Sequence, residues 1–439
     1  MTRTIDINVD AGKSYQTIDG FGVNINPAGY WRDGRLIPVL DLLIHDLGAT
    51  LFRLDPYGFT NWVDPDDSAD RAALNPETYA RSYRSGVFLD AWAMARYLNL
   101  KGLEPLLNVS GIVPRWMCGG DGKTLTDLEA YADILASLAR WAKEEEGVRF
   151  HLFGPFNETD IGPPEGPLLD AAGAARVLCL LADRFAGAGL AGVKFVVADQ
   201  ARFNLDYLRA IAAEPRLRDW VGVAGMHCYG DFPLAPVRDF LAANDLGAWR
   251  YWLTEYGDLD QTGEREWEAA AASARRLLRG LNDGVQAALA WDAYDNFHGH
   301  NDTWSIYGLL RVSVDGYRPK KRYHAAKQVY RFVPPGSVRI EAAAGEDFPS
   351  IAAFRTPEGD VTLVGLVEEE AARLEIRFRD LAPRHRTLRL YLTDREADCE
   401  PALICPWGER LRVTAGAGTI FTLTTLPEGE GGEGWRGSP

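Results

Sequence analysis

The sequence predicts an α/β protein, a (β/α)₈ barrel followed by a smaller antiparallel β-sandwich, on two observations. Between Phe21 and Phe332, short apolar runs alternate with amphipathic stretches, as buried strands alternate with helices. After Val333-Pro334-Pro335-Gly336 the helical stretches stop, and short strand-like runs divided by turn residues continue. This change of pattern indicates two domains.

Eight apolar runs predict the barrel strands. Amphipathic segments lie between them, and eight βα units of this size are typical of a closed barrel. A doubly wound sheet is the alternative, but it would not place polar strand ends around one closed rim. The predicted strands are Phe21–Asn26, Thr50–Leu54, Glu104–Val109, Phe150–Phe156, Lys194–Ala198, Gly222–His227, Tyr251–Thr254 and Ala288–Trp291. The predicted helices include Pro38–Leu47, Val87–Leu98, Leu125–Glu145, Ala171–Ala186 and Glu264–Leu281.

The remaining strand-like runs predict the second domain. The N-terminal run Thr4–Val9 precedes the first barrel strand, so we expect it to join this sandwich. The expected boundaries are 20–333 for the barrel and 1–19 plus 334–426 for the sandwich. Residues 427–439 are rich in Gly and Glu and predict a disordered tail. The later strands are Ser337–Ala342, Ile351–Phe354, Val361–Val367, Leu374–Phe378, Thr387–Leu392, Arg410–Val413 and Thr419–Leu423.

Bulk composition excludes several classes of partner. The 439 residues are 46% apolar, enough for a substantial core, and the net charge of −15 argues against nucleic acid or an anionic membrane as partner. No stretch reaches the roughly 18 apolar residues of a membrane span. The start lacks an apolar signal segment and the five cysteines lack metal-ligand spacing. We therefore expect a cytoplasmic protein with reduced thiols, or a secreted one if a leader precedes this chain; the oligomeric state is not indicated.

Two glutamates at strand ends carry the functional hypothesis. Glu158, after Asn157, ends predicted strand four, and Glu255 ends predicted strand seven. Packing explains such carboxylates poorly, whereas the C-terminal ends of barrel strands usually carry the chemistry. Two carboxyls facing one mouth suit the acid and the nucleophile of a retaining glycosidase. The alternative is that one caps a helix and the other forms an ion pair.

Polar residues on other strands strengthen this hypothesis. Arg53 lies in an otherwise apolar run and needs a buried anion, for which an ionised nucleophile or a structural partner such as Asp55 would serve. His227 ends strand six and can donate to the acid or to a substrate hydroxyl. Tyr229 can hydrogen-bond the nucleophile. A satisfied core histidine and a packing tyrosine are the alternatives.

Three further side chains could contact a sugar. Asn157 offers an amide to a hydroxyl, and Trp291 and Trp116 offer indole faces on which a pyranose can stack. For each tryptophan, a place in the core is the alternative. Together with the two glutamates, Arg53, His227 and Tyr229, these side chains form the predicted site.

No cofactor or metal is expected. The segment Gly187–Gly192 matches GxGxxG, but it follows a helix and precedes a strand, the reverse of a dinucleotide site. His298, His300 and Asp302 share a glycine-containing loop without a regularly spaced further ligand, which favours a substrate-lining loop over a metal site.

These motifs resemble clan A glycoside hydrolases, most closely family 30. Asn157-Glu158 and Glu255 resemble the defining acid and nucleophile positions of that clan. Thr17–Gly22 is similar to the family's opening strand, Trp252–Glu255 to its nucleophile segment, and Tyr330–Gly336 to its exit from barrel to sandwich. The resemblance covers nearly the whole chain.

The resemblance implies a side sandwich joined by the N-terminal strand, with Glu158 as acid/base and Glu255 as nucleophile. It also implies that Asn157 contacts the 2-hydroxyl and that Arg53, His227 and Tyr229 support the pair. Thr159 stands where the family often has proline, and the loops Gly162–Pro167 and Asn61–Gly86 have no match.

The expected function is hydrolysis of a β-type glycosidic bond with retention. Three loops, Asn61–Gly86, Gly162–Pro167 and Asn296–Trp304, would wall off one end of the cleft, which favours an exo-acting enzyme on small glycosides. An endo-acting polysaccharide hydrolase is the alternative within this class. A non-catalytic carbohydrate-binding barrel is the alternative from another class. The sugar and its linkage are not indicated.

Overall fold

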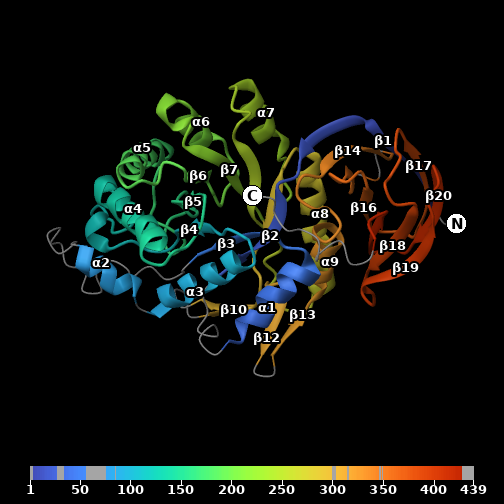
Figure 1. Cartoon of the computed structure of the whole chain (residues 1–439), viewed down its shortest axis with the longest axis horizontal. Helices are drawn as coiled ribbons and strands as arrows, with labels where there is room; N and C mark the ends of the chain where they lie inside the picture. The colour runs from blue at the N-terminus through green and yellow to red at the C-terminus, as the bar shows by residue number, and fades with distance from the viewer. Residues whose placement is uncertain are drawn as a thin grey trace.

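The protein consists of a closed barrel surrounded by helices and a β-sheet domain at one end (Figure 1). The computed structural model describes residues 3–26, 34–55, 76–84, 86–298, 303–313, 316–345, 348 and 350–427. The predicted fold class, a (β/α)₈ barrel with a side β-domain, is confirmed.

The barrel strands all run parallel and pair in chain order. The ring closes where the last strand pairs with the first, with Gly20 opposite Ala287. Every predicted barrel strand is present, shifted by a few residues at most. The strands are β2 (Gly20–Ile25), β3 (Leu51–Leu54), β4 (Leu106–Asn108), β5 (Leu152–Gly154), β6 (Lys194–Ala198), β7 (Val221–Cys228), β8 (Arg250–Tyr256) and β9 (Ala287–Ala290).

Helices cover the outside of the barrel and connect its consecutive parallel strands. Asp127 and Asp170 cap two of them by accepting hydrogen bonds from Ala130 N (3.1 Å) and Gly173 N (2.7 Å). The helices are α1 (Leu36–Leu42), continued by a π-turn over Leu43–Leu47, α2 (Pro76–Tyr83), α3 (Gly86–Leu100), α4 (Leu128–Glu144), α5 (Ala171–Gly187), α6 (Asp206–Ala212), α7 (Ala235–Ala243), α8 (Glu266–Asn282) and α9 (Lys321–Tyr330).

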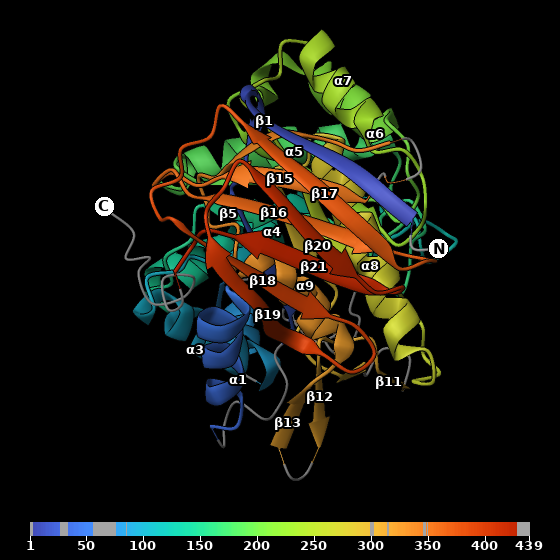
Figure 2. The ribbon, with the colours of Figure 1, turned by 90° about the vertical axis from the view of Figure 1, so that its right-hand side faces the viewer.

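The second domain is one sheet in the order β19-β18-β21-β16-β15-β14-β1-β17-β20 (Figure 2). Apolar residues from distant strands of this sheet share one core, among them Ile7, Leu374 and Phe421. The strands are β1 (Arg3–Thr17), β14 (Val338–Ala343), β15 (Ile351–Arg355), β16 (Val361–Val367), β17 (Ala372–Arg379), β18 (Thr387–Thr393), β19 (Asp398–Pro406), β20 (Arg410–Ala415) and β21 (Thr419–Thr424).

Two features of this sheet differ from the expectation. The N-terminal β1 joins it as predicted, but it pairs parallel with β17 and antiparallel with β14, so the sheet is mixed. The edge strand β19 was not predicted. It contains Pro401 and Pro406 and is mostly exposed, so it lacks the alternation of a half-buried strand.

The last barrel helix connects the two domains. α9 packs on barrel helix α8 and also on β18, β19 and β21 of the sheet. Before it, the hairpins β10–β11 (Asn296–His298, Thr303–Ser305) and β12–β13 (Leu310–Ser313, Gly316–Pro319) extend the connection after β9.

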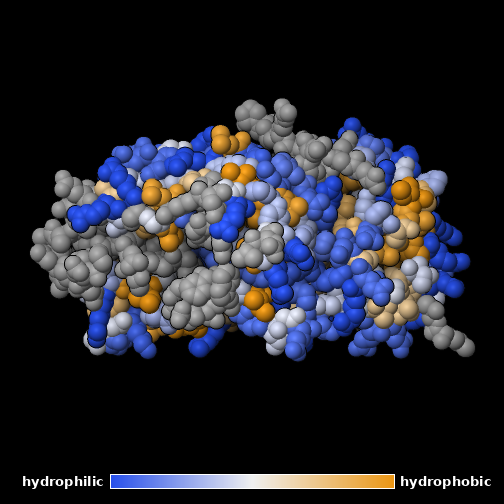
Figure 3. All heavy atoms as spheres, turned by 90° about the horizontal axis from the view of Figure 1, so that it is seen from below, coloured by the Kyte–Doolittle hydropathy of each residue, from blue (hydrophilic) through white to orange (hydrophobic). Residues whose placement is uncertain are grey.

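The described surface is largely polar on the face shown in Figure 3, where apolar residues form small separate groups. Among the described residues, no helix has the length and hydropathy that crossing a bilayer requires.

Candidate active site

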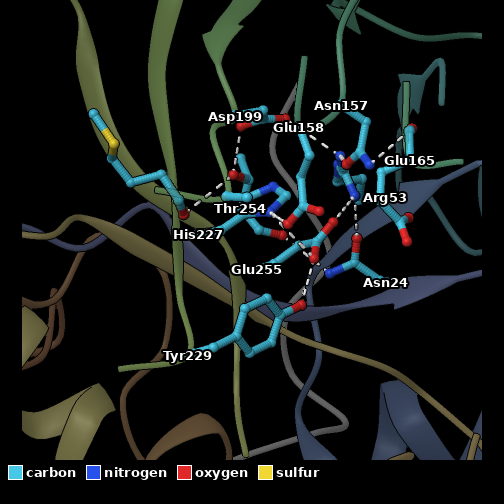
Figure 4. Close-up of polar contacts among 12 residues, drawn as sticks. Asn24, Arg53, Asn157, Glu158, Glu165, Asp199, His227, Tyr229, Thr254 and Glu255 are labelled. Carbon is cyan, nitrogen blue, oxygen red and sulfur yellow. Dashed lines mark hydrogen bonds and ion pairs between the residues drawn. The ribbon is translucent and has the colours of Figure 1, made fainter. Parts of the chain in front are cut away.

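Arg53 is the centre of a buried network at the C-terminal ends of the barrel strands (Figure 4). Its guanidinium donates to Glu255 Oε1 (2.6 Å), Asn24 Oδ1 (2.8 Å), Asn157 Oδ1 (2.8 Å) and Asp199 Oδ2 (3.3 Å). The side chain is fully buried, so it needs these acceptors to offset its loss of hydration. Its ion pairs are with Glu255 and Asp199, whereas Asp55 had been the structural partner considered from the sequence.

A glycine on β7 makes room for Asp199. A Cβ at Gly225 would lie 2.1 Å from Asp199 Oδ1, closer than any real contact. The same oxygen accepts a hydrogen bond from Thr254 Oγ1 (2.5 Å), while Oδ2 faces Arg53. Asp199 therefore links Arg53 to the strand that carries Glu255.

Glu158 lies in a loop beyond β5, in a left-handed backbone conformation with φ of 44°. Its N–H donates to Asp199 O (2.8 Å), and Asp199 also has a positive φ, of 46°. Non-glycine residues rarely adopt this conformation, and they concentrate at functional sites, where the surroundings enforce it. The neighbouring strand-end thus fixes the direction of the Glu158 side chain.

His227 lies between the two glutamates. Its Nδ1 is 2.8 Å from Glu158 Oε1 and 3.4 Å from Glu255 Oε2. Burial lowers the pKa of this imidazole, but the negative charges of Glu255 and Glu158 outweigh it and raise the pKa to about 9. At neutral pH the ring is therefore an imidazolium that donates to Glu158.

Glu255 is held on both carboxylate oxygens. Arg53 donates to Oε1, and the Tyr229 hydroxyl donates to Oε2. Burial raises the pKa of Glu255, and the positive charges of His227 and Arg53 oppose that rise. Burial and the adjacent Glu255 raise the pKa of Tyr229 well above its ordinary value, so Tyr229 stays a neutral donor.

The same residues form the one set in the described part of the chain that could ligate a metal. One ligand atom each of Glu158, His227 and Glu255 lie within 4.8 Å of one another. A divalent cation there would compete with the guanidinium of Arg53 for Glu255 and with His227 for Glu158. Hydrogen-bonded carboxyl groups beside two cations suit acid–base and nucleophilic chemistry better than metal ligation.

The structure brings together Arg53, Asn157, Glu158, His227, Tyr229 and Glu255 of the residues predicted for the site. Asn157 also donates from Nδ2 to Glu165 O (3.2 Å). Trp291 follows β9 directly and lies beside Tyr307. Trp116, in a 3₁₀ turn, packs against the barrel core. His300 and Asp302, of the loop considered for a metal, lie outside the described residues.

Sequence reasoning missed Asn24 and Asp199, which complete the set of acceptors around Arg53. Asp199 follows β6 directly, so the strand-end argument that found the glutamates would have found it too. Asn24 lies inside β2, opposite Arg53 in the strand register. That the Asn24 side chain points into the barrel can be seen only once the barrel is assembled.

Solved structures with this fold were found at low sequence identity. A family 30 endoxylanase from Clostridium papyrosolvens is 17% identical, with a TM-score of 0.72 over 96% of this chain and 100% of that one. The chain has the barrel-and-sheet fold of a glycoside hydrolase family 30 enzyme. None of the sequence models of known protein families matches it.

Two further structures show how widely this fold is used. A conserved exported protein from Bacteroides fragilis is 15% identical, with a TM-score of 0.74 over 95% of this chain and 99% of that one. A monomeric β-xylosidase from Caulobacter crescentus is 14% identical, with a TM-score of 0.65 over 96% of this chain and 99% of that one. An endoxylanase and a β-xylosidase thus share the fold, and the fold does not distinguish endo from exo action.

Proposed function

We propose that the protein is a retaining glycoside hydrolase that cleaves a β-type glycosidic bond in a carbohydrate substrate. The observation that carries this proposal is the arrangement of the two glutamates. Oxygens of Glu158 and Glu255 approach within 4.8 Å, with Arg53 and Tyr229 on one carboxylate and His227 on the other. Retaining enzymes have carboxyl groups about 5–5.5 Å apart, whereas inverting enzymes separate them by about 6.5–9.5 Å.

In the first step Glu255 attacks the anomeric carbon while Glu158 gives its proton to the departing oxygen. The bond to the leaving group breaks, and the sugar becomes esterified to Glu255. Arg53 and Tyr229 hold the attacking carboxylate in one orientation, which removes rotational freedom before the reaction.

In the second step Glu158, now a carboxylate, takes a proton from water. The resulting hydroxide attacks the anomeric carbon from the face that the leaving group left, and Glu255 is released. His227 donates to Glu158 and so holds its carboxyl group in place in this step. These residues carry both steps without a metal or organic cofactor.

We also propose exo action on small glycosides. Its support is the sequence-based expectation that long loops close one end of the cleft. Of the three loops, only Gly162–Pro167 lies wholly within the described residues, where the carbonyl of Glu165 accepts from Asn157 Nδ2 and from Gly111 N (2.8 Å). This loop therefore lies directly beside the proposed acid.

A panel of nitrophenyl glycosides that differ in sugar and anomer tests the activity. We expect turnover of at least one β-glycoside. Proton NMR during the first minutes should show the β-anomer of the free sugar appearing before mutarotation. A fluorinated substrate analogue should label Glu255, as peptide mass spectrometry would show.

Three results would overturn parts of this proposal. An α-anomer as first product would mean inversion. Sugar binding by calorimetry without turnover of any glycoside would favour the non-catalytic carbohydrate-binding barrel. Release of internal fragments from long oligosaccharides would make the protein endo-acting.

A further inference from the structure

Three polar residues form an arc on neighbouring strand ends beside the catalytic network. Asp292 follows β9, Asn26 follows β2 and Asp55 follows β3, and these strands are adjacent in the barrel. Backbone hydrogen bonds hold the three strand ends together, from Ala293 N to Asn24 O (2.9 Å) and from Asp55 N to Ile25 O (3.3 Å). We call Asn26, Asp55 and Asp292 the polar arc.

Each side chain of the polar arc is almost fully buried, yet each has atoms without a hydrogen-bond partner. Asn26 and Asp55 are 2% exposed and Asp292 is 1% exposed. Both amide atoms of Asn26, Oδ1 of Asp55 and Oδ1 of Asp292 are unpartnered. Leaving such a group unpaired costs about 1–3 kcal/mol, and most buried polar groups in native proteins are paired. Several unpaired polar groups beside one site therefore indicate that these groups bind a ligand.

The polar arc lies within electrostatic range of the proposed nucleophile. Burial raises the pKa of Asp55 to about 6, although the positive charge of Arg53 opposes the rise. Burial, with Asp295 nearby, raises the pKa of Asp292 well above its ordinary range. The charge of Glu255 adds to both shifts. The carboxyls of Asp55 and Asp292 are therefore close enough to Glu255 to interact with its charge.

The charged groups around the polar arc disfavour the binding of a sugar that carries a carboxylate. The described charged groups here include the carboxyls of Asp55, Glu158, Asp199, Glu255, Asp292 and Asp295, against the cations Arg53, His227 and Lys320.

The nearby cations already have partners, although Nε of Arg53 and Nε2 of His227 have none. Arg53 already donates to four side chains, and Lys320 binds Asp295 Oδ1 (2.7 Å) and Ile306 O (2.6 Å). Of the unpartnered atoms of the polar arc, three are oxygens and one, Nδ2 of Asn26, is a donor. A sugar hydroxyl can both donate and accept, whereas a sugar carboxylate can only accept and would face the carboxyls of Asp55 and Asp292.

We propose that Asn26, Asp55 and Asp292 bind hydroxyl groups of the sugar between the two glutamates and select an uncharged sugar over a uronic acid. This inference rests on the proposed glycosidase function and deepens it. Asp55 and Asp292 are specificity-determining residues here, and they take no part in proton transfer to the leaving group.

The first test compares substrates on the wild-type enzyme. The neutral aryl β-glycoside that the panel identifies is paired with the matched uronide, which carries a carboxylate on carbon 5 of the same ring. We expect kcat/KM to be at least about 100-fold higher for the neutral member, because two or more hydrogen bonds are replaced by repulsion. Equal rates, or preference for the uronide, would overturn the proposal.

The second test replaces one carboxyl at a time with an amide of the same shape. Asp55→Asn and Asp292→Asn should each lower kcat/KM for the neutral glycoside about 10-fold or more and narrow the neutral-to-uronide ratio. A folding defect would lower both rates equally and leave the ratio unchanged. Asp380→Asn, at an exposed position of the sheet domain, is the matched control and should change neither rate.

The outcomes separate this inference from the function on which it rests. If the wild type turns over no glycoside at all, the glycosidase proposal fails. If it turns over a neutral glycoside but both Asn variants keep the wild-type ratio, only the role of the polar arc fails.

Discussion

The two ends of the same eight strands have opposite chemistry. At the floor of the barrel, side chains from consecutive strands form a small apolar layer that includes Leu106, Leu152, Val196 and Val223. At the mouth, the same strands end in the charged network around Arg53 and in the polar arc. Burial of apolar area at the floor stabilises the folded protein. At the mouth, each buried charge needs a partner to offset the hydration that it has lost.

Stability and activity are therefore controlled by different layers of one barrel. Substitutions at the floor should lower stability and spare activity, whereas substitutions at the mouth should lower activity, with His227 as a mouth residue that also contributes to stability. Five predictions test this separation: four are ordered by the loss of activity that each change should cause, and one concerns the pH dependence of stability.

Glu255→Gln should cause the greatest loss. Without a nucleophile the glycosyl ester cannot form, so kcat should fall by more than about 10⁴-fold. Initial rates on the best aryl glycoside measure this, with Glu264→Gln, an exposed glutamate before α8, as the control. Wild-type activity in Glu255→Gln would show that the nucleophile is misassigned.

Glu158→Ala should come next. Loss of acid–base assistance should slow turnover about 10²- to 10⁴-fold. The enzyme should still be glycosylated by substrates with good leaving groups, and azide should restore product release as a β-glycosyl azide. Failure of azide to rescue, with normal folding by circular dichroism, would argue that Glu158 has another role.

Gly225→Ala tests whether the mouth depends on its packing. The new methyl group would displace the Asp199 carboxylate and hence Arg53, and a misplacement of about 1 Å can cost about 100-fold in rate. Gly247→Ala, where a Cβ would meet nothing within 4 Å, is the matched control. Equal kcat/KM values for the two variants would contradict the prediction.

His227 should make stability depend on pH. Its pKa is about 9 in the folded protein and about 6.5 when unfolded, so the folded state holds the proton more tightly. This contribution is fully present below about pH 6.5 and is lost as the pH rises through about 9. Urea unfolding of wild type and His227→Gln should show a stability difference that shrinks between about pH 6 and about pH 9.5. A pH-independent difference would refute this.

Leu152→Ala, at the floor, should change activity least. The cavity should lower the free energy of unfolding by about 2–5 kcal/mol, while kcat/KM of the folded enzyme stays within about twofold. Thermal unfolding and initial rates well below the unfolding temperature measure the two quantities. A large loss of activity in the folded variant would show that the two layers are coupled.

Local sequence pattern was enough to predict much of the fold and to select the two glutamates proposed as the catalytic pair. Alternation of apolar runs and helices located all eight barrel strands, and the strand-end argument located Glu158 and Glu255. The side domain was recognised, except for β19, whose prolines and exposure hide its pairing. Asn24 was missed because its inward direction depends on barrel geometry, which one strand does not encode, and Asp55 was considered only as a structural partner of Arg53.

The position of β1 also bears on how the protein is made. This first segment pairs with strands near the other end of the chain, Asn8 with Ala343 and Ile5 with Leu374. During synthesis, β1 therefore stays unpaired until the whole barrel, and then β14 and β17, have left the ribosome. A chain cut after the barrel would keep β1 on the barrel side and leave the sheet without the strand between β14 and β17. We therefore expect the two domains to fold properly only when they are produced as one chain.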